Sequence, residues 1–157
     1  MAKGTHTYVC AVEWTGNTGN GTGGYKNYGR DHLIRMNGKS DIAGSADPAF
    51  RGDATRHNPE DMLVASISTC HMLWSLHLAS DAGIIVTAYS DAPVGTMVED
   101  ADRGGYFTRV ALHPSVQLAA GSDPEKAQAL HKRAHHFCFI ANSVNFPITC
   151  EPVVTVV

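Results

Sequence analysis

The chain has 157 residues, of which 43% are hydrophobic and 17% charged, and its formal net charge is −3. This length fits one folded domain with its own apolar core, and the composition is typical of a globular protein. The small negative charge gives no electrostatic reason to expect binding to nucleic acid or to an anionic membrane surface. We therefore expect a single domain over residues 1–157 that binds neither nucleic acid nor a membrane.

The N-terminal segment and the cysteines bear on the compartment of the protein. The N-terminus lacks the apolar run of a signal peptide, and no stretch reaches 18 uninterrupted apolar residues, so we expect a cytoplasmic protein. The cysteines, at positions 10, 70, 138 and 150, form no CxxC pair and no zinc-finger spacing. In a reducing compartment such cysteines are usually free thiols, and a disulfide between two of them is more often catalytic than structural.

The first third of the chain is predicted to form short strands and loops. Residues 5–14 and 25–36 have the pattern of strands, and the second ends at an Asn-Gly turn signal. The glycine-rich residues 16–24 match GxGxxG by letter, but a strand rather than a helix follows, so we interpret them as a turn and not as a phosphate-binding loop. Residues 38–57 are predicted to contain a short strand and a long loop, and long loops are often functional.

Residues 59–82 are predicted to form a long helix. Asn58 can cap its first turn, Pro59 suits the first helical position, and Gly83 is typical of a helix end. Apolar side chains recur at spacings of 4, 3, 4 and 4, which places them on one face. This face carries a thiol in its centre and consists of Leu63, Ile67, Cys70, Trp74 and Leu78.

A second long helix is predicted to begin near Pro124, capped by Ser122 or Asp123. Strands are expected over residues 84–100, 106–119 and 148–157, the first two as an antiparallel meander. No βαβ alternation is present, so we predict an α+β fold in which two long helices pack with mostly antiparallel sheets. The apolar stripe of the second helix consists of Ala127, Leu130, Ala134, Cys138 and Ala141.

Cys70 and Cys138 each lie on the apolar face of a predicted helix, and two interpretations are open. Both could be inert, well-packed core residues. Alternatively, one thiolate attacks the O–O bond of a peroxide, and the second thiol condenses with the resulting sulfenic acid to a disulfide. An ionised thiol in an apolar site needs a nearby cation, for which a guanidinium held by a carboxylate is best suited.

Glu60 is the obvious carboxylate, ten residues before Cys70. That spacing corresponds to about 15 Å along a helix, which is too far for direct contact. Either an extended arginine bridges the two residues, or a second copy of the chain supplies one of them. We prefer the second alternative, a homodimer, because two long helices rich in small residues invite a partner.

The segments NPEDMLVASISTCHML and AHHFCFIANSVNFPITCEP resemble those around the two cysteines of the OsmC/Ohr family, the osmotically inducible and organic hydroperoxide resistance proteins. The resemblance is clearest from Phe50 onward. It implies an intertwined α+β homodimer with two long central helices and with active sites at the dimer interface. Phe139 stands where Ohr proteins typically have proline, and the segment CFIANS resembles the OsmC-like branches.

The resemblance also implies roles for individual residues. Cys70 matches the peroxidatic cysteine, Cys138 the resolving cysteine, and Glu60 the glutamate that orients an arginine. Arg30 is the best match to the catalytic arginine of the Ohr branch, and Arg51, which matches the OsmC branch, is held in reserve. The implied activity is the reduction of organic hydroperoxides in oxidative stress defence, without a cofactor and with recycling by a dithiol reductant of the lipoyl type or another.

Two other functions compete with this interpretation. His131, His135 and Cys138 share one helical face, and Cys70 with His71 could complete a tetrahedral metal site. The chain could also bind small apolar molecules without catalysis. In that case the pocket would be lined by Trp74, Phe137 and Phe139.

Overall fold

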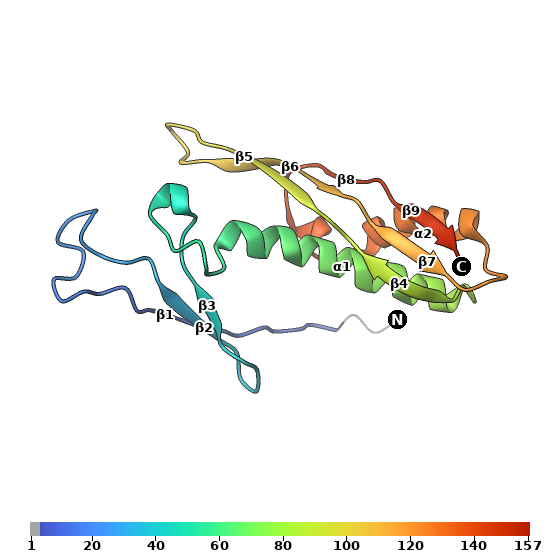
Figure 1. Cartoon of the computed structure of the whole chain (residues 1–157), viewed down its shortest axis with the longest axis horizontal. Helices are drawn as coiled ribbons and strands as arrows, with labels where there is room; N and C mark the ends of the chain where they lie inside the picture. The colour runs from blue at the N-terminus through green and yellow to red at the C-terminus, as the bar shows by residue number, and fades with distance from the viewer. Residues whose placement is uncertain (1–3) are drawn as a thin grey trace. The chain divides into compact units, whose positions relative to one another are not determined.

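The structure is a computed structural model that describes residues 4–157 (Figure 1). Its internal contacts divide the chain into two compact units, Met1–Met62 and Leu63–Val157. Groups of strands are separated by the two helices, and antiparallel strand pairs outnumber parallel ones. No βαβ unit was expected from the sequence, but the second helix connects two parallel strands of one sheet, because the C-terminal segment returns to the sheet in the same direction. The predicted α+β class with mostly antiparallel sheets is confirmed.

The first unit contains a three-stranded antiparallel sheet in the order β1-β2-β3. Its strands are β1 (Ala11–Trp14), β2 (His32–Arg35) and β3 (Ile42–Gly44), which are shorter than predicted. The glycine-rich segment is a turn, as expected, in which Asn17 Oδ1 accepts hydrogen bonds from the backbone N–H groups of Gly19 and Gly21, both at 2.9 Å. A short 3-10 helix, η1 (Pro48–Phe50), interrupts the loop after β3.

The first unit has no apolar core of its own. Within residues 4–62 no hydrophobic side chain is buried, and Val9, Val12 and Tyr25 are largely exposed. A sheet of three short strands is stable only when an apolar face is covered. The sheet β1-β2-β3 therefore needs a surface to pack against.

Helix α1 (Pro59–Asp81) closely matches the predicted range. The N–H of Asp61 donates to Asn58 Oδ1 at 2.7 Å, and Gly83, with φ of 72°, provides the left-handed residue after the helix. The predicted apolar face is only partly buried, through Ile67 and Leu78. The structure also buries a polar face that the sequence did not predict, formed by Ser68, His71 and Ser75.

By length and composition alone, α1 could cross a membrane, since its most apolar 18-residue window has a mean hydropathy of 1.3. A helix in the core of a folded protein can have the same length and hydropathy. Ile67 belongs to one apolar cluster of the second unit, and Leu78 and Ala79 belong to the other. Only 33% of the apolar window is buried within the chain, so much of α1 is left for another surface.

The strands of the second unit form two three-stranded sheets, β4-β7-β9 and β5-β6-β8. Three long segments each contribute one strand to both sheets, and each is interrupted between them at a proline, Pro93, Pro114 or Pro152. The two C-terminal strands do not pair with each other: β8 lies parallel to β6, and β9 lies parallel to β7, the strand that precedes the second helix. The expected antiparallel meander does not include these parallel pairs. The strands are β4 (Val86–Ser90), β5 (Val94–Val98), β6 (Tyr106–Leu112), β7 (Ser115–Leu118), β8 (Ile148–Cys150) and β9 (Val153–Val156).

Helix α2 (Pro124–Phe137) is capped by Asp123, whose Oδ1 accepts from the N–H of Lys126 at 3.0 Å. The helix is shorter than predicted, because Cys138 and Ala141 lie beyond its end. Cys138 has an extended backbone, with φ of −65° and ψ of 111°. The side-chain amide of Asn142 donates to the carbonyl of His136 at 3.0 Å, which satisfies one of the last carbonyls of the helix. The next turn is a 3-10 helix, η2 (Ala141–Ser143).

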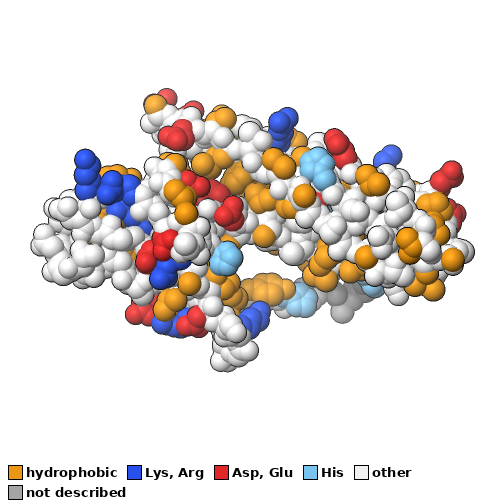
Figure 2. Space-filling view, viewed as in Figure 1, with side chains coloured by type: hydrophobic (Ala, Val, Ile, Leu, Met, Phe, Trp, Pro, Cys, Tyr) orange, Lys and Arg blue, Asp and Glu red, His pale blue; other side chains and the backbone are white. Residues whose placement is uncertain are grey.

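Two apolar clusters hold the second unit together. One joins the C-terminal half of α1 and helix α2 to the sheet β4-β7-β9, and the other joins the first turns of α1 to β6 and β8. Other hydrophobic side chains remain at the surface of the face shown in Figure 2. Exposed hydrophobic side chains of this unit include Leu73, Val94, Phe139 and Val153.

Candidate functional site

The packing of α1 against the end of α2 brings the thiols of Cys70 and Cys138 together. Cys70 is partly exposed on α1, whereas Cys138 is only 1% exposed. Burial raises the pKa of the Cys138 thiol to about 11, with a hydrogen bond to the Cys70 side chain as the second cause. The backbone N–H of Ala141 donates to Cys138 Sγ at 3.4 Å. All four cysteines are free thiols.

Aromatic side chains from α1 and from the end of α2 lie beside the thiol pair. Trp74, one turn after Cys70 on α1, stacks on Phe137 with ring centroids 5.2 Å apart and meets Phe139 edge-on at 5.6 Å. A shallow pocket of about 180 Å³ is lined by Leu73, Trp74 and His77. The surroundings of the thiol pair are therefore predominantly apolar, and part of that apolar surface is exposed.

Glu60 lies in the first turn of α1, where one of its carboxylate oxygens, Oε2, is buried and has no hydrogen-bond partner among residues 4–157. A buried carboxylate oxygen without a donor costs folding free energy, so it is usually found where a ligand or another chain completes it. Glu60 and Cys70 occupy one continuous helix, and ten residues correspond to about 15 Å along its axis.

Of the two candidate arginines, only Arg30 has partners for its side chain within residues 4–62. The guanidinium of Arg30 donates to the carbonyls of Tyr25 and Tyr28, and it lies over both rings, at 4.4 and 4.1 Å from their centroids. Arg51 is exposed and has a left-handed backbone, with φ of 66°, at the end of η1. Within residues 4–62, the structure does not join Glu60 to either candidate arginine.

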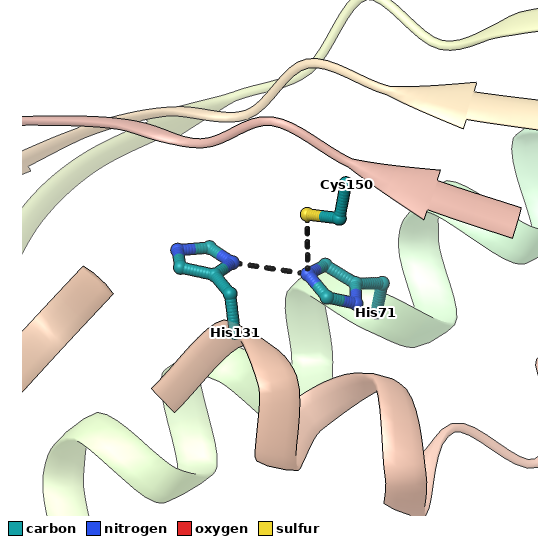
Figure 3. A group of neighbouring side chains, drawn as sticks. All are labelled: His71, His131 and Cys150. Carbon is teal, nitrogen blue, oxygen red and sulfur yellow. Dashed lines mark hydrogen bonds between the residues drawn. The ribbon is translucent and has the colours of Figure 1, made fainter. Parts of the chain in front are cut away.

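A second cluster of reactive side chains lies in the core of the second unit (Figure 3). His71 comes from α1, His131 from α2 and Cys150 from β8. His71 Nε2 is 3.0 Å from His131 Nδ1 and 3.4 Å from Cys150 Sγ, and the two imidazoles stack with centroids 5.3 Å apart. The metal site considered from the sequence was wrong in its members, because His131 meets His71 and Cys150 rather than Cys138.

Burial sets the protonation of this cluster. It lowers the pKa of His71 to about 4, with further lowering by His131 and His135, and it also lowers the pKa of His131. Burial, followed by the charge of Asp91 and then Glu151, raises the pKa of Cys150 to about 12. At neutral pH the cluster therefore consists of two neutral imidazoles and a protonated thiol.

Sequence reasoning included His71 and His131 in a candidate metal site but missed Cys150 as their neighbour. The available signal was the polar spacing of Ser68, His71 and Ser75 on a helix that is otherwise apolar, since a polar stripe at positions i, i+3 and i+7 predicts a second buried face. No local pattern connects that stripe with Cys150, which lies on a strand 79 residues later.

Solved structures resemble this chain over nearly its whole length. An OsmC-like protein of unknown function from Vibrio cholerae is 29% identical, with a TM-score of 0.86, and the match covers 95% of this chain and 100% of that one. An organic hydroperoxide resistance protein OsmC from Legionella pneumophila is 18% identical, with a TM-score of 0.71 and coverage of 98% and 99%. The organic hydroperoxide resistance protein OhrB of Bacillus subtilis is 20% identical, with a TM-score of 0.61 and coverage of 96% and 98%.

Among curated proteins, no sequence matches the chain. The family model described as OsmC-like protein matches residues 52–152, which include both cysteines of the Cys70–Cys138 pair and the whole His71–His131–Cys150 cluster. Together with the fold that the chain shares with OsmC and Ohr structures, this match shows that the chain belongs to the OsmC-like family.

Proposed function

We propose that this protein is a two-cysteine thiol peroxidase that reduces organic hydroperoxides, with Cys70 as the peroxidatic and Cys138 as the resolving residue. The observation that carries the proposal is the unequal exposure of two adjacent thiols. Cys70 is partly exposed and can meet a substrate, whereas Cys138 is buried against it. Several solved structures of similar fold are named as organic hydroperoxide resistance proteins, which supports this chemistry.

The reaction balances in three steps. The Cys70 thiolate attacks the distal oxygen of ROOH, the O–O bond breaks, and the products are a Cys70 sulfenic acid and, after protonation, the alcohol ROH. The Cys138 thiol then condenses with the sulfenic acid, which forms the Cys70–Cys138 disulfide and releases water. An external dithiol, of the lipoyl type or another, reduces the disulfide by thiol–disulfide exchange and is itself oxidised.

The raised pKa of Cys138 supports the resolving role of this residue and the peroxidatic role of Cys70. Because its pKa is about 11, Cys138 is a protonated thiol at neutral pH and a poor first nucleophile. In the resolving step the Cys138 sulfur attacks the Cys70 sulfenic acid, and the proton of Cys138 leaves with the sulfenic hydroxyl group as water. The order of the two cysteines thus follows from their burial.

The working form in this proposal is a homodimer. The sheet of the first unit has no buried hydrophobic side chain within residues 4–62, and most of the apolar window of α1 is unburied. A second copy is the occupant that fits both surfaces, because it offers the same apolar helix and the same incomplete sheet in return. Active sites at this interface would be completed by residues of both chains.

Glu60 and an arginine are the positioning and activating groups in this proposal. The partnerless buried oxygen of Glu60 calls for a guanidinium. Arg30 is our first candidate and Arg51 the second. Arg30 would exchange its bonds to two tyrosine carbonyls for charge-assisted bonds to Glu60 and to the Cys70 thiolate, which are stronger.

The apolar surface formed by Leu73, Trp74, Phe137 and Phe139 favours alkyl hydroperoxides over hydrogen peroxide. An alkyl group gains free energy on leaving water for such a surface, whereas hydrogen peroxide has no apolar part. The rate with cumene hydroperoxide is therefore expected to exceed that with hydrogen peroxide, and the reverse order would contradict this part of the proposal.

The decisive experiment is peptide mass spectrometry after one equivalent of cumene hydroperoxide is added to the reduced protein. We expect a Cys70–Cys138 disulfide in the wild type and in the control variant Cys10→Ser, whose substituted thiol is exposed and distant in sequence. Cys70→Ser should abolish peroxide consumption. A sulfinic acid at Cys70 beside an intact Cys138 thiol in the wild type would overturn the resolving role.

The same variant separates a peroxidase from a non-catalytic binder of small apolar molecules. A serine in place of Cys70 changes the pocket wall little, so a pure binder would keep its ligand. A wild type that binds an apolar probe yet consumes no hydroperoxide would replace the proposed function with binding.

A further inference from the structure

His71, His131 and Cys150 have no part in the proposed peroxidase reaction, yet they form the most concentrated set of metal-ligating atoms among residues 4–157. His71 is 1% and His131 is 5% exposed, so both imidazoles are removed from water. Their ligand atoms and Cys150 Sγ all lie within 4.8 Å of one another. Buried polar groups of this kind need partners, because an unpaired one costs folding free energy.

From this geometry we propose that His71 Nε2, His131 Nδ1 and Cys150 Sγ form a zinc-binding site in the core of the second unit, separate from the Cys70–Cys138 pair. Two imidazole nitrogens and one thiolate are a ligand set that Zn²⁺ prefers. Three protein ligands leave one position of a tetrahedron for an exchangeable group such as water.

Two of the three separations between the ligand atoms are close to those of a tetrahedral zinc site. With Zn–N near 2.0–2.1 Å and Zn–S near 2.3 Å, neighbouring ligand atoms of a tetrahedron stand about 3.3–3.6 Å apart. The observed separations are 3.0 Å between the two nitrogens and 3.4 Å between His71 Nε2 and Cys150 Sγ. These two separations would widen by a few tenths of an ångström around the ion. The third pair, His131 Nδ1 and Cys150 Sγ, lies within 4.8 Å and would adjust to the same tetrahedral spacing.

The ligand atoms also point at one another in the required way. Figure 3 shows His71 Nε2 between the other two ligand atoms, with contacts to both. In the metal-free state this nitrogen must serve both neighbours with one proton or one lone pair. The other nitrogen of His71, Nδ1, is buried and has no hydrogen-bond partner among residues 4–157. A zinc ion at Nε2 would replace both shared contacts of that nitrogen and would place the ring proton on Nδ1.

Charge around the cluster favours a cation. Asp91 lies beside it, held by a hydrogen bond from the Ser68 hydroxyl on the same face of α1 as His71 and by a 2.7 Å bond from the N–H of His113. The Asp91 carboxylate is thus held next to the polar face of α1 that carries His71. A Cys150 thiolate and the Asp91 carboxylate together would balance the two charges of Zn²⁺.

One side of the cluster borders a cavity. His131 and Cys150 line this cavity of about 530 Å³, whereas His71 lies outside it. The cavity is open to solvent, and its wall combines apolar residues with Glu125 and Lys132. The fourth ligand position of the proposed site can therefore face this cavity, from the side of His131 and Cys150.

The test uses the full-length protein without a histidine tag, reduced and stripped of metal, and titrates Zn²⁺ against a chromophoric chelator. We expect one zinc per chain. Replacement of an outer-shell partner of a metal site already weakens binding about 10- to 100-fold, so His71→Ala and Cys150→Ser should each weaken it at least 100-fold. The matched control is His136→Ala, an exposed histidine on the same helix as His131, which should leave the affinity unchanged.

Two outcomes would overturn the proposal. One is a wild type that binds zinc no more tightly than Cys150→Ser. The other is zinc binding that persists in His71→Ala and Cys150→Ser but disappears in Cys70→Ser or Cys138→Ser, which would move the metal to the other thiols. Zinc binding is measured without peroxide, so its result tests the zinc site independently of the peroxidase proposal.

A measurement on the wild type covers the case in which a core variant fails to fold. Cobalt added to the metal-free protein should produce a sulfur-to-cobalt charge-transfer band. Zinc should also protect Cys150 from alkylation in a peptide map while the exposed Cys10 reacts at an unchanged rate. Equal alkylation of Cys150 with and without zinc would overturn the proposal even if no variant could be purified.

Discussion

The backbone N–H of Ala141 donates a hydrogen bond to Cys138 Sγ at 3.4 Å, just after the chain has left α2. This bond holds the thiol at the turn into η2, where Cys138 is next to Cys70 but shielded from water. The N–H group lowers the pKa of Cys138, yet burial and the Cys70 side chain outweigh it and raise that pKa to about 11.

The raised pKa predicts an order of alkylation in the reduced protein. At pH 8 iodoacetamide should modify the exposed Cys10 well before Cys138, and the rate at Cys138 should keep rising with pH until its pKa, near 11, is passed. Since the folded state holds this proton more tightly than the unfolded state, the contribution of Cys138 to stability is complete below pH 9 and is lost as the pH rises toward 11. Peptide mass spectrometry at several pH values provides the measurement. Modification of Cys138 at pH 8 as fast as Cys10 would contradict the assigned protonation state.

The unpaired buried oxygen of Glu60 predicts a selective loss of activity in Glu60→Gln. The substitution keeps the shape but removes the charge that would hold a guanidinium, and loss of one preorganised electrostatic contact typically costs about 100- to 1,000-fold in rate. The neighbouring Asp61→Asn serves as the control, because Asp61 is exposed and only supports the helix start. The pH profile of kcat/KM should shift upward for Glu60→Gln alone. Equal losses in both variants would reduce Glu60 to a structural role.

The same experiment decides between the two arginines. Arg30→Lys and Arg51→Lys both keep the positive charge, but only the substitution of the activating arginine removes a forked donor. We expect Arg30→Lys to reproduce the loss of Glu60→Gln and Arg51→Lys to be close to wild type. The opposite pattern would transfer the role to Arg51.

A homodimer predicts that Leu73→Lys reduces self-association. Leu73 is 62% exposed on α1, and a lysine there would place a charge in the proposed apolar interface. Val94→Lys is the control, since Val94 is similarly exposed, at 55%, but lies on β5. Sedimentation velocity should show a dimer for the wild type and for Val94→Lys and a larger monomer fraction for Leu73→Lys. A monomeric wild type at micromolar concentration would refute the assembly.

The helices could be predicted from the sequence because the signals that begin them are local. Each helix is capped by a side-chain oxygen, of Asn58 or Asp123, that accepts from the backbone N–H three residues later. A short stretch of sequence therefore contains the whole capping signal. The end of α2 could not be predicted in the same way. No glycine or proline marks it, and the helix stops where Asn142 reaches back to a helix carbonyl, a contact that depends on the fold of the following turn.

The two candidate sites also differ in how far the sequence alone predicts them. The adjacency of Cys70 and Cys138 could be suspected, because each thiol lies in an apolar run on or beside a helix. The cluster of His71, His131 and Cys150 could not, because it depends on the parallel pairing of β8 with β6. Strand β8 has only three residues, which are too few to show an alternating hydrophobic pattern. Pro152, which follows it, also makes the segment look less like a strand.

The buried polar face of α1 provides a last prediction, about stability. The Ser68 hydroxyl donates to Asp91, so Ser68→Ala leaves that carboxylate oxygen without this donor and should cost about 1–3 kcal/mol of unfolding free energy. Ser66→Ala is the matched control on the same helix, because the Ser66 hydroxyl only donates to the carbonyl of Leu63. Alanine has the higher helix propensity, so the control should be neutral or slightly more stable than the wild type. Urea unfolding of the metal-free protein at pH 7 measures both variants. If Ser68→Ala proved as stable as Ser66→Ala, the bond to Asp91 would contribute nothing to the fold, and Asp91 would be solvated through another route.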